Sequence, residues 1–151
     1  MTTRNQKLWV FAIVMLSFFM TTCRKDISVP NQDLDKLFTT WNWVQSTGGF
    51  AGQVTSPATT GYSQTIEFGR DGIYKRYKNG KLLDKFKFTL SEGTSIFSTG
   101  SAFLIKYEQT GIFSSNDSPM ISQSIKFGGQ DTLFLNDEVY DGYSNIYTKS
   151  N

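Results

Sequence analysis

Histidine is absent from this chain of 151 residues. That absence removes the commonest general base and the commonest transition-metal ligand of proteins. Nucleophilic systems that pair a serine or a cysteine with histidine are therefore excluded. Zinc sites built from cysteine and histidine are excluded for the same reason.

Cysteine occurs once, at Cys23, shortly after an apolar run, Leu8–Phe19. Arg4 and Lys7 precede that run. A basic start, an apolar stretch of about a dozen residues and small residues before a cleavage point are typical of a secretory signal. The run is too short for a membrane-spanning helix, which needs ~20 residues.

A cysteine at the cleavage point resembles the signal of bacterial lipoproteins, although Met20 and Thr22 replace the preferred leucine and small residue. The resemblance implies that Cys23 carries a lipid such as palmitate and becomes the new N-terminus. Two or more acyl chains anchor a protein stably, because each buried methylene contributes ~0.8 kcal/mol. No aspartate directly follows Cys23, which implies the outer membrane and leaves surface exposure open. The alternative is plain secretion with a free thiol.

The net charge predicts no nucleic-acid partner. Removal of residues 1–22 takes Arg4 and Lys7 away, which leaves thirteen of the fifteen basic side chains against thirteen acidic ones. The remaining chain is close to neutral, so it has no basic field to attract nucleic acid. If Cys23 is acylated, no thiol remains for a disulfide or for thiol chemistry.

Apolar and polar residues alternate along eight short segments, which predicts eight β-strands. The predicted strands are Thr40–Val44, Tyr62–Phe68, Ile73–Lys78, Lys81–Leu90, Ala102–Glu108, Ile121–Phe127, Thr132–Leu135 and Ser144–Lys149. Asn79-Gly80 predicts a two-residue hairpin, because both residues tolerate positive φ. Segments Thr47–Thr60 and Gly111–Pro119 are predicted loops, Ser95–Phe97 a stub of strand, and Gln32–Phe38 a short helix.

Sequential strands joined by short turns predict an all-β fold, an antiparallel up-and-down barrel of eight strands with a short N-terminal helix. Closing such a meander removes the exposed edges that invite aggregation. The predicted organisation is a signal peptide at 1–22, a lipid-anchored tether with the short helix at 23–36, and a barrel domain at 37–151.

The order of these pieces resembles the lipocalin-like lipoproteins of Gram-negative envelopes. The resemblance rests on Thr40-Trp41-Asn42-Trp43-Val44 after a short helix, a long Gly-rich first loop, Ile66-Glu67-Phe68, Asp71-Gly72-Ile73-Tyr74, Asn79-Gly80 and Asp131-Thr132-Leu133-Phe134-Leu135. It implies that Trp41 closes the base of the barrel. Thr39 stands where lipocalins proper have glycine, and only Lys149 is available as the basic residue that usually covers that tryptophan.

Inward-facing aromatic side chains are the candidate ligand-binding residues. They are Trp43, Phe50, Phe68, Tyr74, Phe86, Phe88, Phe103, Tyr107 and Phe127. Ligand sites in barrels are lined in this way, with a few polar groups for orientation. The competing interpretation is that these rings fill the barrel, since each large ring buries ~150–250 Å².

Three other clusters have plainer interpretations. Gly48–Gly52 lacks the helix and the lysine of a phosphate loop, so it is expected to be a loop at the barrel mouth, with Phe50 as a lid. Asn136–Glu138 with Asp141 lacks the spacing of an EF-hand, so no metal is predicted. Glu67 and Glu108 could form a glycosidase pair but are expected on the outer face, so no catalysis is predicted.

Six basic residues lie within one predicted hairpin: Lys75, Arg76, Lys78, Lys81, Lys85 and Lys87. They could face anionic lipid or an acidic glycan. Lysines on the wet face of a strand also discourage edge pairing, and this second interpretation is favoured.

Together these observations predict a non-catalytic, lipid-anchored protein of the bacterial cell envelope. Its expected partners are the membrane, through Cys23, and a small apolar or ring-bearing molecule inside the barrel. The alternative is a protein-interaction module of an envelope complex, with a barrel filled by side chains. No cofactor is predicted.

Overall fold

The computed structural model describes residues 32–113 and 121–151. The predicted signal segment 1–22 and the predicted anchor Cys23 lie outside the described residues, and so does most of the predicted loop Gly111–Pro119. No helix in the described ranges is long and apolar enough to cross a membrane.

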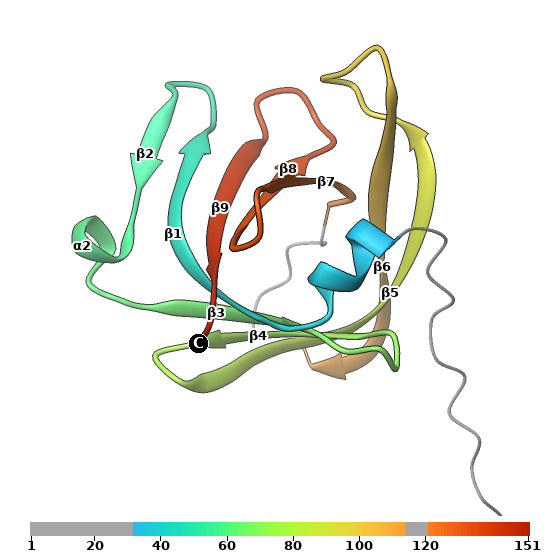
Figure 1. Cartoon of the computed structure of the whole chain (residues 1–151). Coiled ribbons are helices and arrows are strands. Elements are labelled where there is room, and N and C mark those ends of the chain that lie inside the picture. Colours follow the sequence, from blue (N-terminus) through green and yellow to red (C-terminus); the bar gives the residue numbers. More distant parts are fainter. Residues whose placement is uncertain (1–31, 114–120) are drawn as a thin grey trace, which may run out of the picture.

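The described residues form nine strands, eight of which close into an antiparallel barrel (Figure 1). The strands are β1 (Thr40–Gly48), β2 (Gln53–Thr55), β3 (Gln64–Phe68), β4 (Ile73–Lys78), β5 (Lys81–Thr94), β6 (Ser101–Phe113), β7 (Gln123–Gly128), β8 (Thr132–Asp137) and β9 (Tyr143–Lys149). From β3 to β9 each strand pairs with the next in the chain, and β1 pairs with both β3 and β9. The predicted eight-stranded antiparallel barrel is therefore confirmed.

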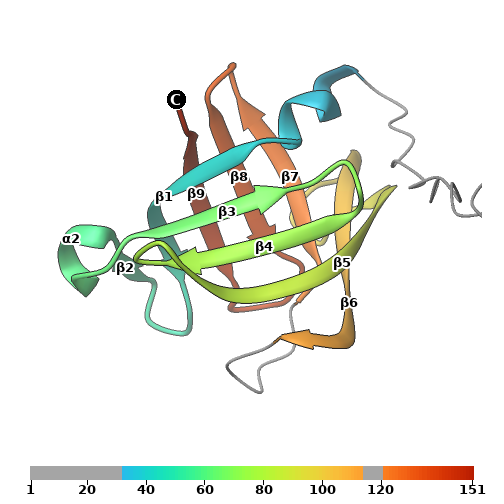
Figure 2. The same cartoon turned by 90° about the horizontal axis from the view of Figure 1, so that it is seen from below.

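The strands of the barrel lie in two crossing groups. In Figure 2, β3, β4 and β5 run across the near side, while β7, β8 and β9 cross behind them. The turn between β4 and β5 is the predicted one, with positive φ at Asn79 (49°) and Gly80 (74°). This conformation matches the right-handed twist of the two strands that it joins.

Two segments differ from their predictions in the structure. The predicted loop Thr47–Thr60 contains β2, which pairs with the end of β1, and the short helix α2 (Pro57–Thr60). Ser56 begins α2 with a capping box, which sequence periodicity does not reveal. Ser95–Phe97 is not a strand, because β5 continues to Thr94 and the chain then turns back to Ser101.

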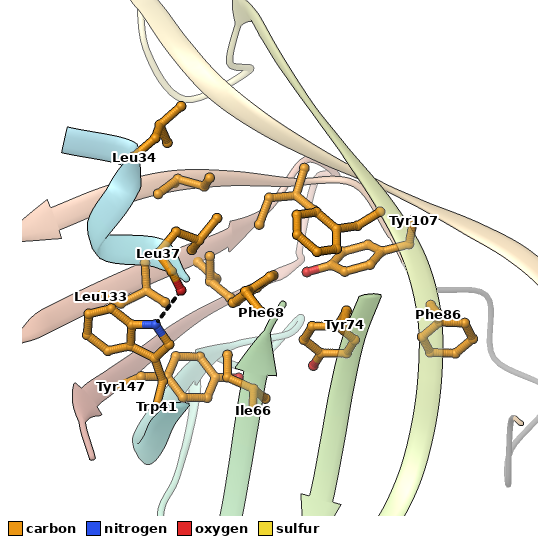
Figure 3. Packing of buried hydrophobic residues seen from close by; sticks show 14 of the residues in the cluster. Leu34, Leu37, Trp41, Ile66, Phe68, Tyr74, Phe86, Tyr107, Leu133 and Tyr147 are labelled. Carbon is orange, nitrogen blue, oxygen red and sulfur yellow. Dashed lines mark hydrogen bonds between the residues drawn. The ribbon is translucent and has the colours of Figure 1, made fainter. Parts of the chain in front are cut away.

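One end of the barrel is closed by η1 (Gln32–Leu37), a 3-10 helix that lies across it (Figure 1). Leu34 and Leu37 are both 0 % exposed. Trp41, also 0 % exposed, donates a hydrogen bond from Nε1 to the Leu37 carbonyl oxygen at 3.0 Å (Figure 3). The Arg70 guanidinium lies 4.9 Å from the centre of the Phe38 ring just after η1. We call this the closed end.

The buried core occupies the barrel from the closed end to its middle (Figure 3). It consists of Leu34, Leu37, Trp41, Trp43, Ile66, Phe68, Tyr74, Phe86, Phe88, Ile105, Tyr107, Ile125, Leu133, Leu135 and Tyr147. All of these side chains belong to one cluster between Leu34 and Tyr147, so residues 24–151 contain the whole of this core. We call residues 24–151 the barrel segment.

Candidate functional site

The opposite end of the barrel holds a cavity of about 490 Å³. Its lining is Trp43, Ser46, Thr55, Tyr62, Gln64, Tyr74, Arg76, Ile121, Gln123, Asp137, Tyr143, Asn145 and Tyr147. Six barrel strands contribute to this lining, together with β2 and the chain next to β3 and β7. We call this cavity the cup.

Inward-facing side chains change from apolar to polar along β1, β3, β5, β7, β8 and β9 toward the cup. In β3 the order is Phe68, Ile66, Gln64, and only the last of these lines the cup. Comparable series are Trp41, Trp43, Ser46 in β1; Phe88, Phe86, Asp84 in β5; Ile125, Gln123 in β7; Leu133, Leu135, Asp137 in β8; and Tyr147, Asn145 in β9. The strands therefore build a barrel that is packed at one end and polar at the other.

Stacked aromatic rings form part of the cup wall. The rings of Trp43 and Tyr62 lie 5.6 Å apart and within 17° of parallel. Lys78 Nζ lies 4.0 Å from the centre of the Tyr62 ring, a cation–π contact. The cup wall therefore contains two stacked aromatic rings, and a positive charge lies over one of them.

Hydrogen bonds fix the Trp43 side of the cup. Trp43 Nε1 donates to Ser46 Oγ at 2.8 Å, and Ser46 Oγ donates to Asn145 Oδ1 at 2.6 Å. A β-bulge between Trp43 and Gln45 shifts the alternation of β1, which turns Ser46 inward. The tryptophan is thereby held in one orientation.

A second network links β6, β7, β8 and β9. Tyr107 Oη donates to Gln123 Oε1 at 2.8 Å, and Gln123 Nε2 donates to Asp137 Oδ1 at 2.8 Å. Asp137 Oδ2 accepts the backbone N–H of Tyr143 at 3.0 Å. Both carboxylate oxygens of Asp137 thus have a donor within the protein.

An ion pair lies inside the barrel between β4 and β5. Arg76 Nε donates to Asp84 Oδ2 at 2.6 Å, and Nη2 of the same guanidinium also contacts that oxygen. The Asp84 side chain is 1 % exposed and the Arg76 side chain 28 %. Arg76 lines the cup, whereas Asp84 lies behind it.

Burial keeps the inward tyrosines protonated. Desolvation raises the pKa of Tyr74 and of Tyr107 well above the ordinary value, and it also raises the pKa of Tyr147. Tyr147 Oη accepts a long hydrogen bond, 3.4 Å, from Gln64 Nε2. The hydroxyls of Tyr74 and Tyr147 at the cup are therefore neutral groups that can donate or accept a hydrogen bond.

The structure divides the predicted wall residues among three places. Trp43 and Tyr74 line the cup. Four others, Phe68, Phe86, Phe88 and Tyr107, are buried in the core, and Phe103 and Phe127 are partly buried against it. Phe50 is 98 % exposed in the turn after β1 and does not line the cup.

Several cup residues were missed by the sequence reasoning. The sequence pattern grouped Arg76 with the lysines of the hairpin. Of the adjacent residues Lys75 and Arg76, only Lys75 faces outward, where its Nζ contacts Glu67 Oε1 at 2.7 Å. Strict alternation from Tyr74 would have placed Arg76 inward. The same rule, applied from Ile125 and Leu135, would have found Gln123 and Asp137.

The acidic candidates do not form a metal-binding cluster in the described ranges. Glu67 accepts hydrogen bonds from Lys75 and Tyr77 on the outer face of the barrel. Glu138 accepts hydrogen bonds from Ser95 Oγ at 2.7 Å and from the Ile96 backbone N–H at 2.8 Å. No group of three or more cysteine or acidic side chains suited to a metal ion is present there.

Comparison of the chain with family models, with curated proteins and with solved structures found no match.

Proposed function

We propose that this protein binds a small, partly apolar, ring-bearing molecule in the cup without catalysis. In this proposal it belongs to the lipocalin-like lipoproteins of the bacterial cell envelope, and a lipid on Cys23 anchors it to the outer membrane. The observation that carries the proposal is the barrel with one packed end and one end that holds a cavity of about 490 Å³. Pockets that bind small molecules have volumes of ~300–1,000 Å³.

The composition of the cup supports a binding role. The Trp43 and Tyr62 rings offer apolar surface for a flat molecule, and Gln64 and Asn145 offer amides that can orient it. A few polar groups among aromatic side chains are typical of ligand pockets. Packing for stability alone would favour apolar side chains at these inward positions, because buried polar groups must be satisfied by hydrogen bonds.

The closed end supports the lipocalin-like part of the proposal. Trp41 is completely buried beneath η1, where the resemblance expects a tryptophan at the base of the barrel. Lys149 stands opposite Trp41 in the register of β1 and β9. The position of η1 over Trp41 and the register of Lys149 support the lipocalin-like part of the proposal.

The competing function is that of a protein-interaction module with a filled barrel. Side chains do fill the closed end, but the cup leaves space for a ligand. Exposed rings such as Phe50 and Tyr140 in the loops are the surface that such a module would use. The binding experiment below separates the two functions.

The test uses phenylnaphthylamine, a neutral dye whose fluorescence rises in apolar surroundings, with the barrel segment. We expect saturable binding of one dye by the wild type. Gln64→Trp should abolish binding by filling the cup, whereas Thr65→Trp should preserve it, because Thr65 lies on the outer face, where its Oγ1 contacts Asn42. Equal binding by both variants would place the dye elsewhere, and no binding by the wild type would contradict the proposal and favour the interaction module.

The anchor is tested with the full chain in bacterial cells. Cys23→Ala should release the protein from membranes into the soluble fraction, because it removes the proposed site of acylation. Membrane fractionation with immunodetection measures this. A variant that stays in the membrane fraction as the wild type does would refute the lipid anchor.

A further inference from the structure

We propose that the cup selects molecules that carry an anionic group, such as a carboxylate, sulfonate or phosphate, and that Arg76 binds that group. This inference rests on the proposed function, since it names the class of ligand that the cup accepts. Three observations support it: the position of Arg76, its unused N–H donors, and the stacked rings of Trp43 and Tyr62 in the same cavity.

Arg76 is placed inside the barrel by strand alternation. It follows Tyr74 by two residues in β4, and both side chains line the cup. A buried ion pair contributes little stability compared with apolar side chains of similar volume. The Arg76–Asp84 pair is therefore better explained by what Arg76 offers to the cup than by the stability of the barrel.

The guanidinium has donors left for a ligand. It carries five N–H groups. Within the described ranges Asp84 Oδ2 is the only hydrogen-bond acceptor that Arg76 contacts, through Nε and Nη2. The N–H groups of Nη1 and the second N–H of Nη2 therefore have no acceptor there, and 28 % of the side chain is exposed.

Asp84 holds Arg76 in place without presenting its own charge to the cup. Its side chain is 1 % exposed and does not line the cavity. An anchored guanidinium loses little side-chain entropy when it binds a ligand, and its planar fork matches the geometry of a carboxylate or a phosphate. Asp84 is thus a positioning residue in this proposal.

The carboxylate that lines the cup, that of Asp137, is already hydrogen-bonded within the protein. Asp137 accepts hydrogen bonds from Gln123 Nε2 and from the Tyr143 backbone N–H, one on each oxygen. These bonds tie Asp137, at the end of β8, to the first residues of β7 and β9. At the rim, Lys78 adds a positive charge over the Tyr62 ring.

The stacked rings indicate which chemical group the ligand carries in addition to its anionic group. Trp43 and Tyr62 stack on each other with their planes within 17° of parallel, and both side chains line the same cavity as Arg76. A molecule with an aromatic ring and an anionic group can use both features together. The predicted ligand class is therefore a small aromatic anion.

The test compares two dyes that differ in one group. Anilinonaphthalene sulfonate carries the rings of phenylnaphthylamine plus a sulfonate. With the barrel segment, Arg76→Gln should weaken binding of the sulfonate dye at least about tenfold, because hydrogen bonds to charged groups are strong. The same substitution should change binding of the neutral dye less than about twofold.

Two controls isolate the effect. Lys75→Gln removes a positive charge from the same strand but from the outer face, so it should leave the affinities for both dyes unchanged. Arg76→Gln alone leaves Asp84 buried without a cation, so the double variant Arg76→Gln/Asp84→Asn is measured as well. It should reproduce the selective loss of the sulfonate dye in a folded barrel.

The outcomes distinguish the two proposals. Equal affinity of the wild type and both Arg76 variants for the sulfonate dye, with normal binding of the neutral dye, would overturn this inference and leave the cup as a binding site. Sulfonate binding that persists in Gln64→Trp would also overturn it, because the anion would then bind outside the cup. A wild type that binds neither dye would overturn the proposed function together with this inference.

Discussion

Leu37→Ala tests whether η1 closes the barrel. The Leu37 side chain is 0 % exposed, and its carbonyl oxygen accepts the hydrogen bond from Trp41 Nε1. Truncating a fully buried leucine removes its transfer free energy and leaves a cavity, which together cost ~2–5 kcal/mol. A domain of this size has a free energy of unfolding of ~5–15 kcal/mol, so the variant should still fold.

The assay is urea unfolding of the barrel segment, followed by tryptophan fluorescence. For an unfolding slope of ~1–3 kcal/mol per molar urea, we expect the midpoint to fall by about 1–2 M with the slope unchanged. Leu82→Ala is the matched control, because Leu82 is 47 % exposed, and it should cost less than about 1 kcal/mol. If both substitutions lowered the free energy of unfolding by the same small amount, η1 would not be packed on the barrel end. The conclusion that η1 closes this end would then be wrong.

Three further substitutions test single contacts. Trp41→Phe removes the donor to the Leu37 carbonyl oxygen and part of a buried ring, so it should lower the free energy of unfolding by about 1–3 kcal/mol in the same assay. Gly48→Ala should cost about 1–3 kcal/mol, because a β-carbon there would collide with the Gly142 carbonyl oxygen across β1 and β9. For Glu138, desolvation raises the pKa, but hydrogen bonds from Ile96, Ser124 and Ser95 outweigh it and lower the pKa. A carboxyl group whose pKa is lower in the folded than in the unfolded state stabilises the fold at pH values above its unfolded pKa of ~4.3. This stabilisation is lost as the pH falls through the folded pKa. Glu138→Gln should therefore lower the urea midpoint at pH 7, and the difference from wild type should shrink below about pH 4.

Matched controls accompany two of these substitutions. Gly100→Ala adds the same β-carbon where only ordinary contact with Ser98 Oγ results, so it should be close to neutral. Glu92→Gln removes an exposed carboxylate, and its effect on the midpoint should be small at every pH. A Gly48→Ala variant as stable as Gly100→Ala would refute the close approach of β1 to β9, and a pH-independent effect of Glu138→Gln would refute the role of its charge.

The sequence was sufficient to predict the barrel, because alternation with period two places residues on known faces. Trp41 and Trp43 in β1, and Ile105 and Tyr107 in β6, are buried as that alternation predicts. Hairpin residues with positive φ, such as Asn79, marked a turn correctly. Strands and turns can be predicted from the sequence because each depends on a few neighbouring residues.

The candidate site was predicted less well, for two physical reasons. The bulge after Trp43 shifts the alternation of β1, so Ser46 faces inward although simple counting puts it outside. Arg76 and Asp84 were not recognised because buried charges are rare and make sense only as a pair across two strands. The volume of the cup depends on how the strands close around it, which no local pattern contains.

Native mass spectrometry of the barrel segment, after exposure to an extract of the bacterial envelope, shows whether a small molecule occupies the cup. We expect a retained small molecule on the wild type and on Thr65→Trp, and none on Gln64→Trp. Bare protein in all three spectra, or a molecule retained equally by Gln64→Trp, would contradict this expectation.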